Sequence, residues 1–496
     1  MLGMNAPEST DRGNPAEDSP PLDLSVDAMH ALGLDVLERI VTHLGEVPGR
    51  HAGGSIESGR IPTATIEGLC ALLPTAPPEH PQPISPILDQ LFDDWIPASY
   101  LTTGPGYLAY VPGGGLFASA IGTFLAAATN RFTGVWAAAP VLVEIEGRAI
   151  GWLRDWMGFP PEAEGLLTSG GSSSNHTAVI VAREKLLGPD IRPGTMYVSE
   201  EVHHSVTKCA RLAGIAPDRV RLIAADDRFR MRTDRLVAAI EEDRRAGLQP
   251  FLVVSSAGTT NTGSVDPLAA IGEIARREGL WHHVDGAYGA FFHLVPELRP
   301  LLAGLSDADS LTLDPHKGLF LPYGTGALLV RRGEDLRAVH EATAGYLPDL
   351  PPDAHYDPSR VGPELSRPYR GLPLWFAVQM HGVATFREAI AEKRTLAVAA
   401  AERLRQEPGI EIVDAPQLSI VPFRAVGEGW NEAEVDRRTR ELLDAVNARG
   451  RVFLSGATVG GRYVARICVL CFRTDATRIA QGLEDIIEAR SELAAC

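Results

Sequence analysis

Residues 310–318 read Ser-Leu-Thr-Leu-Asp-Pro-His-Lys-Gly. The leucine and threonine run predicts a short buried strand, and Pro315 cannot continue its hydrogen-bond ladder, so we expect a turn there. That turn carries His316 and Lys317. A lysine at the end of a buried strand is costly unless it is paired or used, and a desolvated lysine amine is the nucleophile that forms a Schiff base. Taken alone, the stretch fits a surface lysine after a strand equally well.

A second strand-like stretch, residues 280–288, reads Leu-Trp-His-His-Val-Asp-Gly-Ala-Tyr. A buried Asp285 and a Schiff-base Lys317 are the pair that pyridoxal phosphate (PLP) requires, because the carboxylate keeps the pyridine nitrogen protonated. Ala287 is small enough for the ring to lie flat against the backbone. Together the two stretches resemble the fold-type I PLP enzymes. The His-Lys pair and the Asp-x-Ala-Tyr spacing are similar to the group II decarboxylases, which include the aromatic-L-amino-acid and glutamate decarboxylases.

A glycine- and serine-rich turn between a strand and a helix is the predicted phosphate site. Residues 165–175 read Gly-Leu-Leu-Thr-Ser-Gly-Gly-Ser-Ser-Ser-Asn. Free N–H groups and the dipole at a helix start attract anions, and the hydroxyls of Ser173 and Ser174 add donors. A serine-capped helix is the alternative for this stretch alone. Beside Lys317 and Asp285, it is interpreted as the phosphate cradle.

Two further polar segments match the resembled family. Its pattern Ser-Asp-x-x-His-x-Ser is found at residues 199–205, with Glu200 in place of the aspartate. The match implies that His203, rather than His204, stacks on the cofactor ring, although a lone histidine is more often structural. The polar turn 258–263 reaches the cofactor ring and substrate in the family, and Thr260 is its candidate residue here.

The substrate side of the pocket is predicted from two matches to the same family. An aromatic, glycine-rich loop covers the substrate there, and Tyr110 and Pro112 match it, although such loops are also ordinary turns. Gly113 replaces a hydroxyl residue common in the aromatic decarboxylases. Phe132 and Gly134 fall where the family inserts residues into the neighbouring subunit's pocket. Because Gly134 replaces a large aromatic residue, the resemblance implies a wider pocket.

The resemblance also implies a mechanism. PLP is held as a Schiff base on Lys317, with Asp285 keeping its ring nitrogen protonated. His316 and the Tyr110 loop are candidates to hold the substrate carboxylate. Tyr346 matches the tyrosine of a mobile lid that protonates Cα, which gives an amine and CO₂. The implied substrate is an L-amino acid, with an aromatic one as first choice.

Three alternatives remain open from the sequence. The first is another PLP lyase or an aminotransferase on the same fold, and the second is a decarboxylase that also deaminates oxidatively to an aldehyde. Tyr346 and His203 favour the simple amine product. The third is a non-catalytic interaction protein, which the presence of all the PLP motifs disfavours. Asp314 stands where many family members carry asparagine, which puts the donor role of that position in doubt.

Alternating strand and helix patterns predict an α/β fold with a mainly parallel, doubly wound sheet, whose motifs lie at strand ends. Residues 1–26 are expected to be a disordered tail. Residues 27–100 form a predicted helical arm that packs on a partner subunit, so the resemblance implies a homodimer with shared active sites. Residues 101–392 are the expected PLP-binding domain. A helix over about 374–392 leads into a small α/β domain, residues 393–496.

Composition narrows the class of protein. The chain has 496 residues, 45% of them apolar, which is enough for two or three domains. A net charge of −17 argues against nucleic acid as a partner. The pair Cys468 and Cys471 lies in a run typical of a buried strand, so no metal or redox role is expected. Few cysteines, no leader pattern and no long apolar run predict a cytoplasmic protein that does not enter the membrane.

Overall fold

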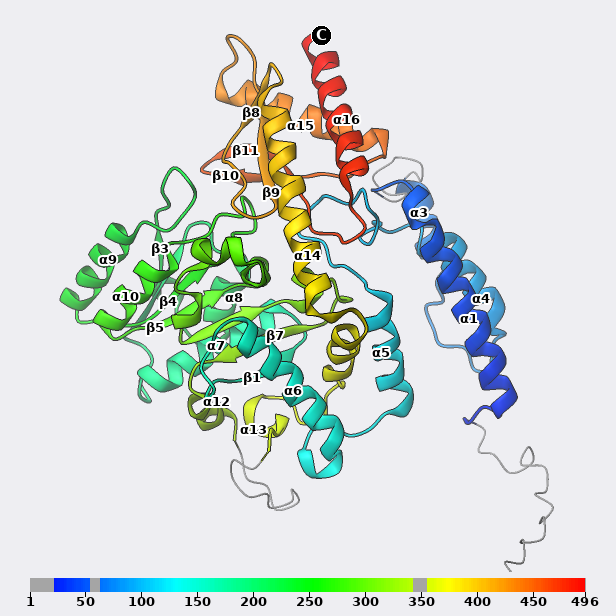
Figure 1. Ribbon diagram of the computed structural model, residues 1–496, viewed down its shortest axis with the longest axis horizontal. Helices are drawn as coiled ribbons and strands as arrows, with labels where there is room; N and C mark the ends of the chain where they lie inside the picture. The colour runs from blue at the N-terminus through cyan, green and yellow to red at the C-terminus, as the bar shows by residue number, and fades with distance from the viewer. Residues whose placement is uncertain (1–21, 54–62, 342–354, 496) are drawn as a thin grey trace, which may run out of the picture.

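The computed structural model describes residues 22–53, 63–341 and 355–495. A large domain, a smaller domain at the C-terminal end and a separate helical arm are visible in Figure 1. Residues 1–21 of the tail that was expected to be disordered lie outside the described part of the chain. The arm begins at Val26, where Ser25 caps the first helix by accepting a hydrogen bond from the Ala28 N–H.

The large domain contains a seven-stranded sheet in the order β1-β7-β6-β5-β4-β2-β3. Strands β3, β2, β4, β5 and β6 are mutually parallel, while β7 is antiparallel to both β6 and β1. The prediction of a mainly parallel α/β sheet is therefore confirmed, with β7 as the exception. The strands are β1 (Glu164–Thr168), β2 (Gly194–Ser199), β3 (Val220–Ile223), β4 (Gln249–Ser256), β5 (Trp281–Asp285), β6 (Ser310–Leu313) and β7 (Gly326–Val330).

Helices cover both faces of this sheet, because successive strand residues point to opposite sides. Leu252 and Val254 of β4 belong to the core cluster that includes α7 and α8, whereas Val253 packs with α9 and α10. The helices of the domain are α5 (Phe117–Thr129), α6 (Pro140–Trp156), α7 (Gly171–Leu186), α8 (His204–Leu212), α9 (Thr233–Arg245), α10 (Leu268–Glu278), α11 (Pro315–Gly318), α12 (Gly333–His340) and α13 (Pro358–Val361).

Several shorter helical turns connect these elements. They are the 3₁₀ helices Val47–Gly49, Trp136–Ala138, Pro217–Arg219, Ala290–Leu294, Pro296–Leu302 and Leu305–Asp307, and a π-helical turn at Leu91–Trp95.

The C-terminal domain is an antiparallel sheet of four strands in the order β10-β11-β9-β8, covered by two helices. The elements are β8 (Ile410–Ile412), β9 (Ile420–Ala425), α15 (Glu432–Arg449), β10 (Ser455–Val459), β11 (Arg462–Cys468) and α16 (Ala476–Ala495). Both Cys468 and Cys471 are buried in or next to β11.

One long helix, α14 (Gly371–Arg405), joins the two domains. The sequence predicted a shorter helix that ends near residue 392, and this prediction is wrong. Ala397, Ala401 and Leu404 continue the helical apolar face and pack in the core of the smaller domain, so the helix continues through the expected boundary at residue 393. Gly382 has φ 73°, outside the helical region, and marks a kink within α14.

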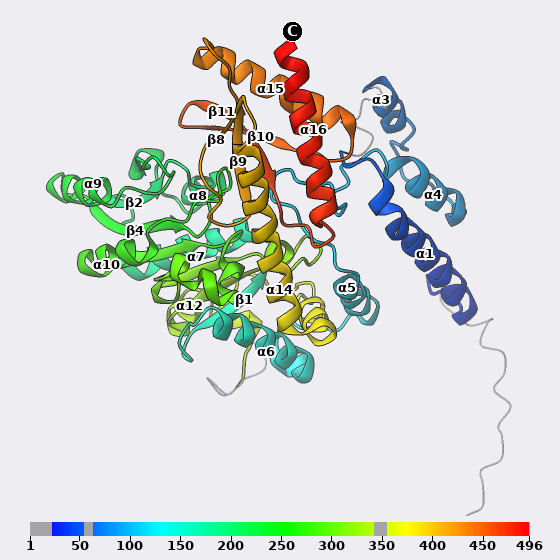
Figure 2. The same ribbon diagram turned by 45° about the horizontal axis from the view of Figure 1, so that its top comes forward.

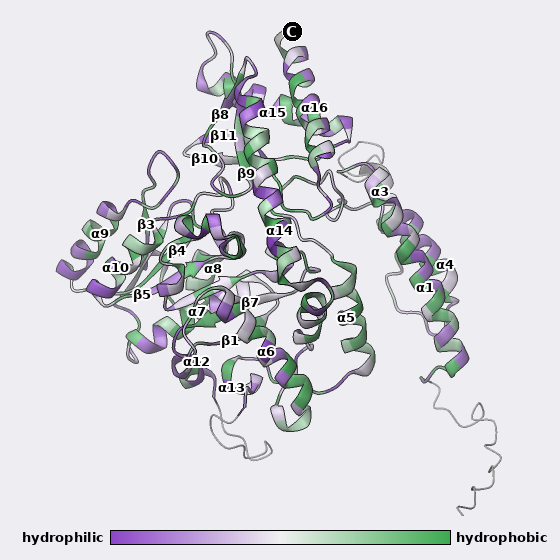
Figure 3. Ribbon diagram, viewed as in Figure 1, coloured by the Kyte–Doolittle hydropathy of each residue, from purple (hydrophilic) through white to green (hydrophobic). Residues whose placement is uncertain are grey.

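The arm stands away from the rest of the chain in both ribbon views (Figures 1 and 2). It consists of α1 (Val26–Glu46), α3 (Thr63–Ala71) and α4 (Ile84–Gln90). No residue of α1 is buried, and green apolar residues recur along it in Figure 3. Met29 and Leu37 are exposed large apolar residues. The apolar side of the arm is therefore uncovered within a single chain.

Two features are absent from residues 22–53, 63–341 and 355–495. No helix there combines the length and the apolar character needed to cross a bilayer. In the same residues, no group of three or more His, Cys, Asp or Glu side chains is arranged to hold a metal ion.

Candidate active site

A cavity of about 650 Å³ opens where several strands of the large sheet end. The segments that follow β1, β2, β4, β5 and β6 all contribute to its wall, together with Tyr110 and Val111. Ligands of open α/β sheets bind at this carboxyl edge. The fold thus brings segments that are far apart in the sequence to one site.

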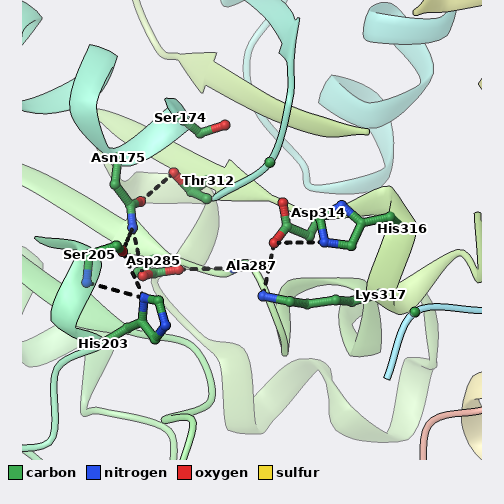
Figure 4. Close-up of polar contacts among 12 residues, drawn as sticks. Ser174, Asn175, His203, Ser205, Asp285, Ala287, Thr312, Asp314, His316 and Lys317 are labelled. Carbon is green, nitrogen blue, oxygen red and sulfur yellow. Dashed lines mark hydrogen bonds and ion pairs between the residues drawn. The ribbon is translucent and has the colours of Figure 1, made fainter. Parts of the chain in front are cut away.

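Lys317 enters the cavity from α11, one turn beyond the end of β6. Its amine lies 2.9 Å from Asp314 Oδ2, and His316 Nε2 lies 3.6 Å from the same oxygen (Figure 4). Asp314 is 1% exposed, and its other oxygen, Oδ1, has no hydrogen-bond partner among the described residues. A primary amine is therefore held at the cavity wall by a neighbouring carboxylate.

Asp285, at the end of β5, has both carboxylate oxygens hydrogen-bonded. The Asn175 amide donates to Oδ2 at 2.8 Å, and the Ala287 N–H donates to Oδ1 at 3.1 Å. Asn175 Oδ1 in turn accepts from the Thr312 hydroxyl at 2.7 Å (Figure 4). Hydrogen bonds of this kind fix a buried carboxylate in one orientation. Sequence analysis did not single out Asn175, although it ends the glycine- and serine-rich stretch.

A buried histidine fixes the orientation of Asn175. His283 Nε2 lies 3.0 Å from Asn175 Oδ1, and His283 Nδ1 lies 2.8 Å from the Ser310 hydroxyl, which also accepts from Trp281 Nε1. Burial holds the pKa of His283 well below its ordinary value, so the ring is neutral. With its proton on Nε2, the ring makes Asn175 Oδ1 an acceptor and turns the amide NH₂ toward Asp285.

His203 lines the cavity at the start of α8, where its Nδ1 lies 2.7 Å from the Ser205 hydroxyl. Burial lowers the pKa of His203, and the smaller opposing effect comes from Asp285. Ala287 lines the same cavity. The structure thus brings His203 and Ala287 to one site, as the sequence predicted.

The glycine turn at the start of α7 has no room for side chains. A Cβ on Gly171 would lie 3.0 Å from the Ala287 Cβ and 3.1 Å from Asp314 Oδ2. Gly170 has φ 150°, which favours glycine. The first turn of this sixteen-residue helix has no side-chain cap, and its residues Gly171, Ser172 and Ser173 line the cavity.

The serines of that turn divide between the cavity and the core. Ser173 lines the cavity, as predicted, and so do Ser169 and Ser172, which sequence analysis did not choose. Ser174 is fully buried, and its hydroxyl lies 2.8 Å from Thr168 Oγ1, so its predicted contact with the phosphate site is wrong. Each helical residue rotates about 100° from the last, which turns Ser174 into the core.

Residues predicted on the substrate side are only partly brought together. Tyr110, which is 53% exposed, and Thr260 line the cavity. Pro112 is buried and does not reach the cavity in the described chain. Phe132 and Gly134 lie between α5 and α6, away from this chain's own cavity.

Two substitutions noted in the sequence have a packing explanation. A side chain at position 134 would clash with the Leu365 carbonyl, so the glycine is required within the chain itself. Beside Gly113, the Tyr323 hydroxyl accepts a hydrogen bond from the Gly113 N–H at 3.0 Å. Tyr323 thus supplies a hydroxyl next to a position where the resemblance led us to expect one. Tyr346 lies outside the described residues.

A lysine amine, an oriented carboxylate at the end of the neighbouring strand and an open helix start within one cavity define a fold-type I PLP enzyme. The residues fit this cofactor, since Lys317, Asp285 and the start of α7 all line one cavity. The pyridoxal-dependent decarboxylase conserved domain matches residues 67–426, so the chain belongs to that family. It is a PLP-dependent amino acid decarboxylase.

Relatives extend over almost the whole chain. An aromatic-L-amino-acid decarboxylase of Bacillus atrophaeus is 32% identical over 463 residues, which is 93% of this chain and 95% of the relative. A phenylacetaldehyde synthase of Arabidopsis thaliana is 29% identical, over 85% of this chain and 89% of the relative. The crystal structure of Oryza sativa TDC with PLP and tryptamine has a TM-score of 0.89 and 25% identity, covering 96% of this chain and 99% of that one.

Proposed function

We propose that this enzyme decarboxylates an aromatic L-amino acid to the corresponding amine and CO₂. The observation that carries the proposal is the presence of both Lys317 and Asp285 in one cavity that Tyr110 also lines. Support for an aromatic substrate comes from the names of the relatives, an aromatic-L-amino-acid decarboxylase and a TDC solved with tryptamine.

The cofactor, when bound, supplies an electron sink for the pair released when the Cα–carboxylate bond breaks. Asp285, oriented by Asn175, would hold a proton on the pyridine nitrogen. Lys317 would provide the amine that anchors the cofactor, and the start of α7, with Ser173 nearby, would bind its phosphate. His203 and Ala287 would hold the ring, since both line the same cavity.

The substrate carboxylate requires an orienting group, because the bond that breaks must stand perpendicular to the cofactor ring. His316 is the proposed group. Its Nδ1–H donates to the Thr325 carbonyl at 2.8 Å, which leaves Nε2 directed toward Asp314. Burial lowers the pKa of His316, so the ring must take up a second proton, on Nε2, before it can donate to the substrate carboxylate. Tyr110 and Thr260 form the wall beside which the side chain of the substrate lies.

The product of the reaction depends on how quickly Cα is protonated, and we assign that proton to Tyr346. The alternative product is an aldehyde, which the Arabidopsis relative named phenylacetaldehyde synthase keeps open. General acid catalysis of this kind contributes about 10²–10⁴-fold. Tyr346→Phe keeps the ring and removes only the hydroxyl that carries the proton.

A product assay tests both parts of the proposal. The PLP-loaded enzyme is incubated with L-tryptophan, L-tyrosine, L-phenylalanine or L-dopa, and amine, aldehyde, CO₂ and hydrogen peroxide are measured. We expect amine and CO₂ from wild type. Tyr346→Phe should shift the product toward aldehyde, ammonia and peroxide, because slower protonation gives dissolved oxygen time to react. Turnover of none of the four, or aldehyde from wild type, would contradict the proposal, and an unchanged ratio and rate in the variant would remove Tyr346 from it.

The enzyme is proposed to act as a homodimer with shared active sites. The arm leaves Met29 and Leu37 exposed, and Phe124 on α5 is 65% exposed. Phe132, on the connection after α5, is exposed and lies away from its own cavity. A second copy would cover these residues and receive Phe132. Light scattering should give twice the chain mass, and the double variant Met29→Glu, Leu37→Glu should lower it. A fully active monomer would rule the proposal out.

The proposed location is the cytoplasm. The four cysteines within the described ranges are all free thiols, which supports a reducing compartment. Fractionation of the source cells, followed by detection of the protein with an antibody, tests this. Recovery in a secreted or periplasmic fraction would contradict it.

A further inference from the structure

A buried arginine of the smaller domain has no carboxylate partner in the described chain. Arg466, on β11, is 2% exposed. Burial lowers the pKa of Arg466. Its neighbour Arg424, on β9, is equally buried but pairs with Asp436 at 2.7 Å and Glu432 at 2.9 Å. A buried charge without a counter-ion needs hydrogen bonds to every donor.

The donors of Arg466 reach across the domain boundary to two loops of the cavity. Its Nε donates to the Asn261 carbonyl at 2.7 Å, and one terminal nitrogen donates to the Thr260 carbonyl at 2.5 Å and to the Tyr110 carbonyl at 3.3 Å. Tyr110, Thr260 and Asn261 all line the cavity. One guanidinium therefore joins the aromatic loop to the polar turn after β4.

A serine on the adjacent strand completes the arrangement. The other terminal nitrogen of Arg466 donates to the Ser455 hydroxyl at 3.0 Å, and that hydroxyl also accepts from the Tyr110 N–H at 2.9 Å. Ser455 lies directly opposite Arg466 in the β10–β11 ladder. Tyr110 is thus held at both its N–H and its carbonyl by the smaller domain.

Tyr110 needs such a restraint. Its φ is 51°, in the left-handed region that residues other than glycine rarely adopt. Strained backbone of this kind persists only where the surrounding structure determines it. The donors of a planar guanidinium have a rigid, fixed geometry. Arg466 therefore fixes the distance between the Tyr110 loop and the Thr260–Asn261 turn, in addition to binding each of them.

We propose that Arg466 is a positioning residue that sets the geometry of the substrate-facing wall by holding Tyr110 and the Thr260–Asn261 turn together. This inference rests on the proposed function in one respect, that the wall faces an amino acid substrate. Lys317, Asp285 and the glycine turn belong to the large domain and make no hydrogen bond to Arg466. Loss of Arg466 is therefore expected to affect substrate affinity and to spare cofactor retention.

The test compares Arg466→Lys with Arg424→Lys in the PLP-loaded enzyme. Lysine keeps the positive charge but lacks the several fixed donors of a guanidinium. Arg424 is a matched control because it contacts Asp436 and the Tyr463 carbonyl instead of residues that line the cavity. We expect Arg466→Lys to raise KM for the aromatic substrate at least about tenfold while kcat changes only a few-fold, since ground-state positioning is lost. Bound PLP per chain should remain at the wild-type level in both variants.

Hydrogen exchange provides a readout that needs no substrate. Amides of residues 107–115 and 258–263 should exchange at least about tenfold faster in Arg466→Lys, and at the wild-type rate in Arg424→Lys. If exchange in these segments were unchanged, or changed equally in both variants, the inference would be overturned. This result would hold for any substrate of the wild-type enzyme. A wild type inactive on aromatic amino acids, with the expected exchange pattern, would refute only the proposed substrate.

Discussion

Lys317 and Asp314 form an ion pair across one helical turn, with 2.9 Å between Nζ and Oδ2. The same oxygen lies 3.1 Å from the point where a Cβ on Gly171 would be placed. Asp314 therefore lies next to both the Lys317 amine and the start of α7, the proposed phosphate site. The carboxylate forms an ion pair with Lys317 but would repel a phosphate beside Gly171, and the first two predictions separate these effects.

Replacement of Lys317 by alanine removes the primary amine, so the borohydride-fixable cofactor adduct and turnover should both be lost. Lys317→Arg is the matched control, because it keeps a positive charge beside Asp314 but has no amine that can form a Schiff base. Intact-protein mass spectrometry after borohydride reduction measures the adduct. Cofactor mass still attached to the alanine variant would place the linkage on another residue.

Asp314→Asn removes a negative charge next to the phosphate turn. We expect the dissociation constant of PLP to fall at least about tenfold, or about 1.4 kcal/mol, because close like charges in a buried site repel strongly. Titration of the cofactor-free protein by fluorescence measures the constant. Pyridoxal, which has no phosphate, should bind both proteins alike. Weaker binding of PLP to the variant would show that the carboxylate contributes favourably to the phosphate site.

Asp285→Asn keeps the shape of the side chain and removes its charge. The cofactor adduct should remain, while kcat should fall by about 10²-fold or more, as for loss of a preorganised electrostatic partner. Asn175→Ala leaves the carboxylate in place but removes the donor 2.8 Å from Oδ2, so a smaller loss is expected. Steady-state kinetics on the two variants shows which of them loses more of kcat. Near-normal turnover by Asp285→Asn would exclude the carboxylate as the partner of the ring nitrogen.

Stability should decrease on mild acidification because of the buried His282. Burial lowers the pKa of His282 from 6.5 to about 3. The unfolded chain therefore takes up a proton first as pH falls, so the contribution of His282 is complete above about pH 6.5 and is lost progressively toward pH 3. By pH 5 the loss is about 2 kcal/mol from this group.

Urea unfolding at pH 7 and pH 5 measures that loss. The decrease should be smaller in His282→Gln, which keeps a polar group near Ser255 but does not titrate. His80→Gln, at an exposed position, should behave as wild type does. Equal decreases in all three proteins would assign the acid sensitivity to other groups.

Much of the site could be predicted from local sequence. Lys317, Asp285, Ala287 and the glycine turn each lie within a few residues of a strand end, and parallel strands bring their ends to one edge. The sheet and the edge that carries the site follow from that regularity, whereas the class of enzyme was implied by the resemblance of these motifs to a known family. The helical arm was also predictable, because an apolar helix face with no partner in its own segment must find one elsewhere.

Other features depend on contacts that no short stretch contains. Helical rotation turned Ser174 into the core while Ser169 and Ser172 reached the cavity. Asn175 orients Asp285 only because two elements distant in the sequence pack together, with His283 behind them.

The sequence by itself determined the chemistry that this protein carries, since the lysine, the aspartate and the glycine turn are local motifs. Only the tertiary structure decided how these groups are oriented and what holds the substrate wall. Arg466 contacts Tyr110 and Thr260, which lie 356 and 206 residues away from it in the sequence. These hydrogen bonds depend on how the two domains pack. A buried guanidinium needs acceptors for its donors, and only the packing of the domains brings these acceptors within reach.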